Sequence, residues 1–300
     1  MHLLFIINPA AGANRASARW TAFQALLWKA GVKSDHALTT RPGEATDLAR
    51  KAAANYDLLV AVGGDGTVTE VSEGILTAPL SRAILGILPL GTGNDLAEVL
   101  GIRTDAIALS AFTAGTTKSI DVLEVRCQAN DRPTVRYALL FAGIGIISHA
   151  LKKTTPGLKR ICGKRLAYPA GLLRALTTYR SPEMTISCSG QVFQGKFLFA
   201  GASNTPIAGG GMMIAPGAAP DDGLLNVNLI KITGCCRALM LLRSLCRGRH
   251  LQHPCVRYFS THCLEIDADD ALEIAADGEL IGKTPARIEV RPGALRVMVP

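Results

Sequence analysis

Short apolar runs alternate with amphipathic stretches over the first 120 residues. The runs have the length of buried strands, and the apolar positions between them recur at helical spacing. Alternation of this kind predicts a parallel sheet with helices on its faces. The predicted strands are 3–7, 34–40, 57–62 and 83–90, and the predicted helices lie near 15–30, at 43–54, from about Thr67 to Leu76 and from about Asn94.

The pattern changes at Ile120, after which strand-like runs are separated by turn residues. These runs include VRYALLFA, EMTISCSG, QGKFLFAGAS, LLNVNLI, ALEIAADGE and ARIEVRP. They predict a largely antiparallel β-domain, interrupted by helical stretches near 147–178 and 234–247. We therefore expect an α/β domain over 1–120 and a β-domain over 121–290, with the segment of about 291–300 as a candidate to return to the first domain.

Glycine-rich loops follow three of the predicted parallel strands. They are NPAAG (8–12), GGDGT (63–67) and LPLGTGND (88–95). Ligands of such sheets bind beyond the carboxyl ends of the strands, where loops lead into helix N-termini. Glycine permits dihedrals and close approach that other residues forbid, so backbone N–H groups can face a phosphate. Asp65 adds a carboxylate, which suggests an accompanying metal ion or a hydroxyl.

Three such loops at one sheet edge predict a nucleotide or polyphosphate site. The alternative is a glycine-rich turn in which Asp65 only caps the following helix. Other phosphate motifs fit less well. DGELIGKT (277–284) is one residue short of a Walker A loop and is followed by Pro285, and GTGNDL and GIGIIS lack the third glycine of a dinucleotide fingerprint.

Composition narrows the class of protein. The 300 residues are 48% hydrophobic and 19% charged, enough for a sizeable core in two domains. The longest apolar run, YALLFAGIGII (137–147), is too short to span a membrane, and the N-terminus lacks a basic leader, so we expect a cytoplasmic protein. The eight cysteines form no C-x-x-C pair. Cys246, His250, His253 and Cys255 are either four metal ligands at an unusual spacing or ordinary structural residues.

Positive charge is concentrated in two segments without carboxylates, 152–180 and 231–257. They hold 14 of the 32 Lys and Arg residues, so the remainder of the chain is net acidic. This asymmetry suggests peripheral contact with an anionic membrane surface. The basic residues are Lys152, Lys153, Lys159, Arg160, Lys164, Arg165, Arg174 and Arg180 in the first segment, and Lys231, Arg237, Arg243, Arg247, Arg249 and Arg257 in the second.

The predicted helix in the second basic segment has two interpretations. Leu239, Leu242 and Leu245 form an apolar face beside Arg243 and Arg247, which is typical of an interfacial helix. Alternatively, this face packs on the core and the arginines are solvated. Nucleic acid is not an expected partner, because aromatic residues make up only 5% of the chain and no binding module is recognisable.

The motifs GGDGT, LPLGTGND, GGGMMIAPGAAPDDGLL and DGE occur in this order over nearly the whole chain. As a set they resemble the bacterial diacylglycerol kinase catalytic-domain family, the YegS-like lipid kinases. The resemblance implies an ATP-binding α/β domain, a β-sandwich domain that holds the lipid, and an active site in the cleft between them. GGDGT alone is also similar to loops of NAD kinases and phosphofructokinases.

The resemblance also implies roles for individual residues. Glu279 is the expected proton acceptor, and Asp222 with the carbonyls of Ala219 and Leu224 is expected to hold a structural Mg²⁺. Thr69 departs from the Asn usual at its position, although its hydroxyl can still form a hydrogen bond. Together with the sheet-edge loops, the expected ATP-binding residues are Asn8, Thr39, Gly63, Gly64, Asp65, Gly66, Thr67, Val68, Thr69, Glu70, Gly91, Thr92 and Asn94.

The residues themselves support part of this assignment. Asp277 and Glu279 lie two apart in a strand-like run, so we expect both carboxylates on one face and a catalytic role for both. A hairpin turn is the alternative interpretation of DGE. Asp65 and Asp95 are further candidates to hold a catalytic metal ion through water. Phosphoryl transfer needs such a base, such metal ions and tightly positioned ATP.

We therefore expect an ATP- and Mg²⁺-dependent lipid kinase acting on a lipid hydroxyl, in diacylglycerol or a related glycerolipid. One alternative is an NAD kinase, which would phosphorylate a soluble dinucleotide. The other is a non-catalytic protein that senses nucleotide and membrane. The sequence does not indicate an oligomeric state.

Overall fold

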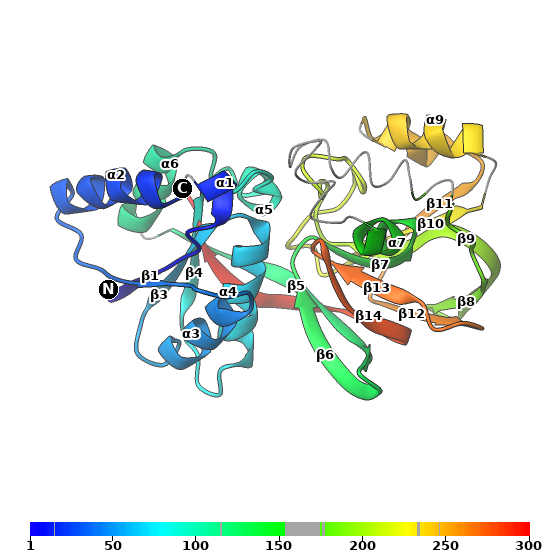
Figure 1. Ribbon diagram of the computed structural model, residues 1–300, viewed down its shortest axis with the longest axis horizontal. Coiled ribbons are helices and arrows are strands. Elements are labelled where there is room, and N and C mark those ends of the chain that lie inside the picture. The colour runs from blue at the N-terminus through cyan, green and yellow to red at the C-terminus, as the bar shows by residue number, and fades with distance from the viewer. Residues whose placement is uncertain (15, 115, 154–174, 176–177, 233–234, 246) are drawn as a thin grey trace. The chain divides into compact units, whose positions relative to one another are not determined.

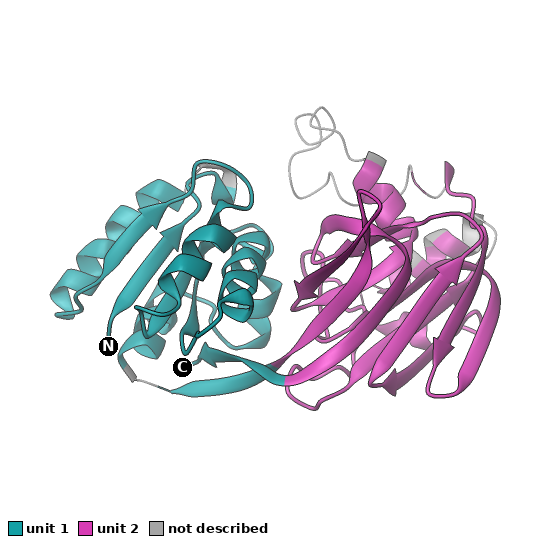
Figure 2. Cartoon of the chain, turned by 90° about the horizontal axis from the view of Figure 1, so that it is seen from below, with its two compact units in different colours: residues 1–120, 293–300 teal, residues 121–292 magenta. Residues whose placement is uncertain are grey.

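The computed structural model describes residues 1–300 except 15, 115, 154–174, 176–177, 233–234 and 246. The chain forms two compact units, one of residues 1–120 with 293–300 and one of residues 121–292 (Figure 2). Two long strands continue from one unit into the other. These strands are β5 (Thr117–Ala129) and β14 (Glu279–Met298).

The first unit is built on a parallel sheet in the order β2-β1-β3-β4, and the end of β14 adds to β4 by a parallel pairing of Val297 with Leu85. Every residue of β1 and β3 is buried, as expected where helices cover both faces of a parallel sheet. The predicted α/β class is therefore confirmed. The strands are β1 (Leu3–Ile7), β2 (Asp35–Leu38), β3 (Leu58–Gly63) and β4 (Ile84–Pro89).

Helices lie on both faces of this sheet, with α2 and α6 on one and α3 and α4 on the other (Figure 1). The centroid of the Phe5 ring in β1 lies 4.9 Å from that of the Trp20 ring in α2 and 5.9 Å from that of the Phe112 ring in α6. On the other face, α4 approaches α3 closely through Gly74. The helices are α1 (Ala11–Asn14), α2 (Ala16–Lys29), α3 (Glu44–Ala52), α4 (Asp65–Thr77), α5 (Asp95–Val99) and α6 (Asp105–Ala114).

The second unit is mainly antiparallel, as predicted. Its ladders close on themselves in the circuit β7-β13-β14-β12-β8-β9, with β10 and β11 extending from β9, and with β5 and β6 extending from β14. The remaining strands are β6 (Arg132–Ala138), β7 (Phe141–Gly145), β8 (Glu183–Cys188), β9 (Gln191–Ser203), β10 (Leu225–Lys231), β11 (Val256–Thr261), β12 (Cys263–Ala268) and β13 (Glu273–Ala276).

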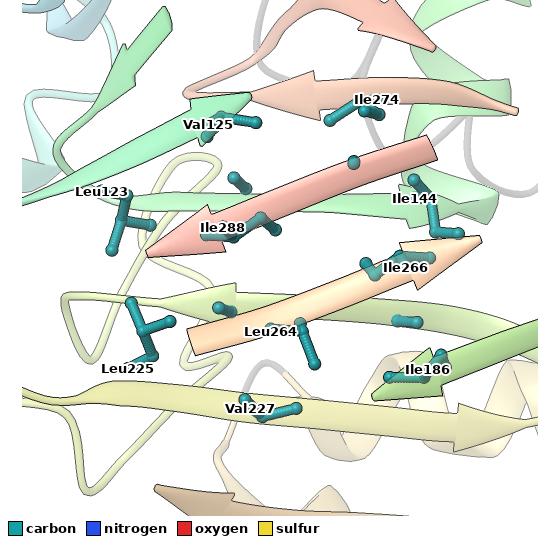
Figure 3. Packing of buried hydrophobic residues seen from close by; sticks show 14 of the residues in the cluster. Leu123, Val125, Ile144, Ile186, Leu225, Val227, Leu264, Ile266, Ile274 and Ile288 are labelled. Carbon is teal, nitrogen blue, oxygen red and sulfur yellow. The ribbon is translucent and has the colours of Figure 1, made fainter. Parts of the chain in front are cut away.

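Apolar side chains from these strands form one buried core (Figure 3). Val125 of β5, Ile144 of β7 and Ile274 of β13 are each buried in it. Ile266 of β12 and Ile288 of β14 join them from the other side of the circuit. Alternation of buried and exposed positions along β8, β12 and β14 follows from the two-residue period of a strand with one face toward this core.

Helices of the second unit are α7 (Ile146–Lys153), α9 (Cys235–Leu245) and the 3-10 helix η1 (Arg249–Gln252). Beyond α7, the predicted helical stretch near 147–178 lies largely outside the described residues, with five of its basic residues. In α9, Ala238 and Leu241 are buried, whereas Met240 and Arg243 are exposed, so the helix packs on the core and also places one apolar side chain in solvent. None of the described helices is both long and apolar enough to span a membrane.

The contact between α3 and α4 gives a prediction for Gly74→Ala. Alanine is favoured over glycine inside a helix by about 1 kcal/mol. A Cβ at Gly74 would nevertheless lie 2.5 Å from Ala49 Cβ and 2.6 Å from the Thr46 carbonyl oxygen. Overpacking of this kind costs about 1–3 kcal/mol, so we expect the free energy of unfolding to fall by about 1–2 kcal/mol in urea denaturation.

Gly66→Ala is the matched control, because Gly66 lies in the same helix and a Cβ there meets nothing within 4 Å. We expect its free energy of unfolding not to fall, because no clash offsets the helix preference of alanine. Gly74→Ala at or above wild-type stability would contradict the packing described for α3 and α4.

Candidate functional site

The three glycine-rich loops meet at the carboxyl edge of the parallel sheet. The Asn8 N–H donates to the Val62 carbonyl at 3.0 Å, and the Leu90 N–H donates to the Gly63 carbonyl at 2.8 Å. The Asn8 side-chain amide donates to Thr67 Oγ1 at 3.1 Å. The parallel register of β1, β3 and β4 therefore brings together loops that are far apart in the sequence.

Glycine is required here for close approach rather than for unusual dihedrals. A Cβ on Gly91 would lie 2.3 Å from the Gly64 Cα, and one on Gly63 would lie 2.3 Å from Thr67 Oγ1. Neither Gly63, Gly64 nor Gly66 has a positive φ, so the dihedral argument made from the sequence is wrong for these three residues. The result is a patch of bare backbone where two loops touch.

The N-terminus of α4 lies at this patch of backbone. The helix begins at Asp65 with Gly64 as its N-cap, two residues earlier than predicted. The first turn of a helix directs backbone N–H groups and the positive end of its dipole outward, which suits a phosphate. Asp65 Oδ1 accepts the Leu96 N–H at 3.3 Å, so this carboxylate caps the neighbouring helix α5 rather than its own.

Asn94 shapes the third loop. It has a φ of 61°, in the left-handed region, and it is the N-cap of α5. Its side-chain oxygen accepts the Gly91 N–H at 3.0 Å, and its amide donates to the Gly91 carbonyl at 3.1 Å. Thr92 is exposed within the loop that these bonds fix, and Asp95 behind it is buried.

Glu70 fixes the segment after β2. Its carboxylate accepts the N–H groups of Gly43 at 3.1 Å and Ala45 at 3.2 Å, at the start of α3. The Thr39 N–H donates to the Ile7 carbonyl at 2.8 Å, which places Thr39 at the same sheet edge. Glu70 therefore positions backbone rather than presenting a free carboxylate.

The four residues at 67 to 70 differ in their exposure. Thr69 and Glu70 are partly exposed, whereas the side chains of Thr67 and Val68 are buried. The N–H groups of Thr67 and Val68 both donate to the Gly64 carbonyl, at 2.9 and 3.1 Å.

In the second unit, the DGE motif is a hairpin turn. Asp277 and Gly278 have φ values of 45° and 87° and connect β13 to β14, so Asp277 and Glu279 do not share one strand. The expectation that both carboxylates lie on one face of a strand is wrong. The Asp277 carboxylate instead accepts the N–H groups of Leu139, Leu140 and Phe141 at 2.7, 2.9 and 3.1 Å.

Glu279 lies directly after this turn. Its side chain is exposed and forms no hydrogen bond or ion pair with any of the described residues. Asp277 holds the turn in place while Glu279 presents a carboxylate to solvent. A carboxylate in such a position can accept a proton from a bound hydroxyl.

The loop that contains Ala219, Asp222 and Leu224 is held by residues that the sequence analysis missed. Buried Asp121 accepts the Gly223 N–H at 2.6 Å, and the Asp121 N–H donates to the Pro220 carbonyl at 2.6 Å. The side-chain amide of Asn204, also buried, donates to the Asp121 carbonyl at 2.9 Å. The only sequence signal for Asp121 is its place in the otherwise mainly apolar run SIDVLEV, which also contains Glu124.

The donor set in this loop suits a hard cation. Asp222 is exposed, and its Oδ1 accepts the Leu224 N–H at 2.9 Å, which leaves its second oxygen and the Ala219 and Leu224 carbonyls as oxygen donors. Mg²⁺ prefers few protein oxygens with water completing its shell. Within the described residues, no group of three or more His, Cys, Asp or Glu side chains could hold a metal ion.

The described members of the candidate metal cluster Cys246, His250, His253 and Cys255 form separate contacts in the structure. His253 Nδ1 lies 3.0 Å from Cys255 Sγ, whereas buried His250 bonds through Nε2 to the Ile214 carbonyl at 3.1 Å. Cys246 lies outside the described residues. The described members therefore serve two separate local contacts.

An apolar pocket lies within the second unit, between the sheet and the helices α7 and α9. It extends from Phe141 of β7 across Phe199 of β9 to Leu241 and Leu245 of α9. Leu245 thus faces the pocket, while the side chains of Leu239 and Leu242 lie outside the described residues. Phe141 is also a residue whose N–H the Asp277 carboxylate accepts, so the pocket begins beside the turn that carries Glu279.

Comparisons with known proteins agree with this architecture. Residues 2–125 match the diacylglycerol kinase catalytic domain, and residues 147–299 match the YegS C-terminal NAD kinase beta sandwich-like domain. A solved structure from Bacillus anthracis strain Sterne, titled as a candidate diacylglycerol kinase, is 26% identical with a TM-score of 0.79 over 100% of this chain and 95% of that one. Yeast NADH kinase, at 12% identity and a TM-score of 0.54 over 99% of this chain and 82% of that one, shares the fold alone.

Curated relatives cover almost the full length. Diacylglycerol kinase of Bacillus subtilis strain 168 is 29% identical over 284 residues, which are 93% of this chain and 90% of the relative. Diacylglycerol kinase of Staphylococcus aureus strain MRSA252 is 31% identical over 285 residues, 94% of this chain and 87% of the relative. Because both domains match in order and the similarity extends over nearly the entire chain, this protein belongs to the diacylglycerol kinase family of lipid kinases.

Proposed function

We propose that this lipid kinase transfers the γ-phosphate of ATP to the hydroxyl of diacylglycerol or a closely related glycerolipid. The observation that carries the proposal is the apolar pocket that begins at Phe141, beside the turn with Glu279. A pocket with an almost wholly apolar lining suits hydrocarbon chains. The bond between Asp277 and the Phe141 N–H places the turn before Glu279 at the start of this pocket, which suits a lipid whose reacting hydroxyl adjoins its chains.

ATP, which a kinase family implies, is proposed to bind at the carboxyl edge of the parallel sheet. The bare backbone at Gly64 and Gly91 permits close approach of phosphates, and the α4 N-terminus supplies N–H groups and a favourable dipole. Thr92 is exposed and able to donate a hydrogen bond. Glu70 supports this site by fixing the segment that follows Thr39.

Glu279 is the proposed proton acceptor, and Asp277 is the proposed positioning residue. Asp277 uses both carboxylate oxygens on backbone N–H groups, which fixes the turn and leaves Glu279 as the exposed base. Asp222, with the carbonyls of Ala219 and Leu224, would hold Mg²⁺. When bound, Mg²⁺ neutralises negative charge that develops in phosphoryl transfer.

Contact with an anionic membrane surface is proposed for exposed residues in and beside α9. Met240 is 61% exposed and Ile232 is 44% exposed. Arg243 and Arg247 are exposed nearby in sequence. Exposed apolar side chains among arginines suit peripheral attachment to acidic lipid headgroups.

NAD phosphorylation is the second candidate, and it is favoured only by the shared fold. A soluble dinucleotide gives no role to the apolar pocket between α7, α9 and the sheet. The pocket therefore supports the lipid substrate over the dinucleotide, and the free Glu279 carboxylate supports catalysis over a purely sensing role.

Glu279→Gln tests the proposed base. Glutamine retains the size of the side chain but cannot accept the proton, so we expect kcat with dispersed diacylglycerol to fall by about 100-fold or more. ATP affinity and the thermal midpoint should not change, because Glu279 is exposed and forms no bond with described residues. A kcat within about threefold of wild type would show that another group accepts the proton.

Asp277→Ala should behave differently. It leaves the N–H groups of Leu139, Leu140 and Phe141 without their acceptor, at a cost of about 1–3 kcal/mol for each that stays buried. We therefore expect a fall in the free energy of unfolding of about 3 kcal/mol or more in urea denaturation, accompanied by loss of activity. An unchanged stability with lost activity would instead assign Asp277 a direct catalytic role.

Gly91→Val tests the proposed phosphate site. Its side chain would meet Gly64 Cα and Gly64 N, at 2.3 and 3.0 Å from the Cβ position. The two loops must separate to admit it, so we expect the Kd for ATP to rise by about 10-fold or more, measured by calorimetry. Lipid binding should be unaffected, and an unchanged Kd for ATP would place the phosphates elsewhere.

A further inference from the structure

The apolar pocket of the second unit contains two buried polar side chains. They are Asn228 of β10, which is 2% exposed, and His250 of η1, which is 1% exposed. All other described residues that line the pocket are apolar or glycine. Polar groups in such surroundings are costly unless they are hydrogen-bonded, so the partners of these two decide what the pocket can bind.

Both side chains form a hydrogen bond with the same backbone carbonyl. Asn228 Nδ2 donates to the Ile214 carbonyl oxygen at 2.5 Å, and His250 Nε2 lies 3.1 Å from the same oxygen. A carbonyl only accepts, so the proton of the imidazole is on Nε2. Burial lowers the pKa of His250, which keeps the ring neutral and leaves a lone pair on Nδ1.

Two acceptors therefore remain without a donor. Asn228 Oδ1 and His250 Nδ1 are buried and have no hydrogen-bond partner among the described residues. A group that satisfies them must carry O–H or N–H. Ester carbonyls, ether oxygens and ionised phosphates have no donor and cannot satisfy either acceptor.

We propose that the pocket binds a hydrocarbon chain that carries a hydroxyl group, and that this hydroxyl donates to Asn228 Oδ1 or His250 Nδ1. The proposal rests on the proposed lipid substrate and refines it to lipids with a hydroxylated chain. A site built around acceptors discriminates against a chain that lacks the donor, because binding the plain chain leaves the acceptors unpaired. The hydroxyl in the pocket is distinct from the one that receives phosphate.

The test is a binding measurement without ATP or Mg²⁺. Monoacylglycerols of one chain length, plain or with a single hydroxyl at successive chain positions, are titrated into the full-length protein by calorimetry. We expect the hydroxyl at one position to lower the Kd about 10-fold relative to the plain chain. Values within about twofold of the plain chain at every position would overturn the proposal.

Variants locate the effect. Asn228→Leu removes one acceptor and should reduce the preference for the hydroxylated chain, whereas Ile230→Val, at an apolar lining position, should retain it. Circular dichroism establishes whether each variant folds. If Asn228→Leu does not fold, the comparison of plain and hydroxylated chains with the wild-type protein decides the question. An ordered water bound to both acceptors in a crystal structure with the hydroxylated chain would also overturn the proposal.

Transfer assays separate this proposal from the proposed function. A hydroxyl preference in binding without phosphate transfer to any lipid would support the pocket assignment and contradict the kinase substrate. Transfer to plain and hydroxylated diacylglycerol with equal KM would support the kinase and contradict the pocket assignment.

Discussion

The carboxylate of Asp277 is the interaction on which the second unit's functional region depends. It binds three consecutive backbone N–H groups, from Leu139 to Phe141, across 136 to 138 residues of sequence. Asn204 binds the same segment from the other side, through the carbonyls of Leu139 and Leu140. The segment is thus fixed at both its donors and its acceptors, and with it the turn before Glu279 and the start of the apolar pocket at Phe141.

The first unit depends on a different constraint, the close approach of backbone at the sheet edge. Gly64 and Gly91 touch because neither has a side chain, and Asn94 and Asp65 then tie the loops to α5. Side chains that the sequence suggests as nucleotide ligands thus serve partly as supports. Glu70 is an example, since both its oxygens are bonded to the start of α3. Exposed backbone is therefore the main feature that supports the proposed phosphate site.

The sequence predicted what depends on local pattern. Apolar runs followed by glycine loops identified the parallel sheet and the three loops that meet at its edge. Strands β11 and β12 were missed, because their half-buried alternation is interrupted by a single residue, His262. Helix α6 was missed as well, since its nearly uniform apolar sequence lacks a clear polar face.

Contacts between residues far apart in the chain could not be predicted from the sequence pattern. Asp121 and Asn204 acquire their roles from partners 83 to 102 residues away, which no local spacing reveals. The DGE motif did contain a turn signal, because Asp-Gly favours a tight hairpin turn. The surrounding apolar residues suggested one continuous strand instead, and the prediction followed them. The outcome matters for chemistry, since it separates Asp277, which holds backbone, from Glu279, which is exposed.

The most direct test of the central claim is a competition assay with γ-labelled ATP and Mg²⁺. The purified chain is offered detergent-dispersed diacylglycerol, other glycerolipids and NAD in one series, and the labelled products are separated. The account predicts label in a glycerolipid and none in NAD. Label in NAD, or no label in any acceptor while ATP remains bound, would contradict it.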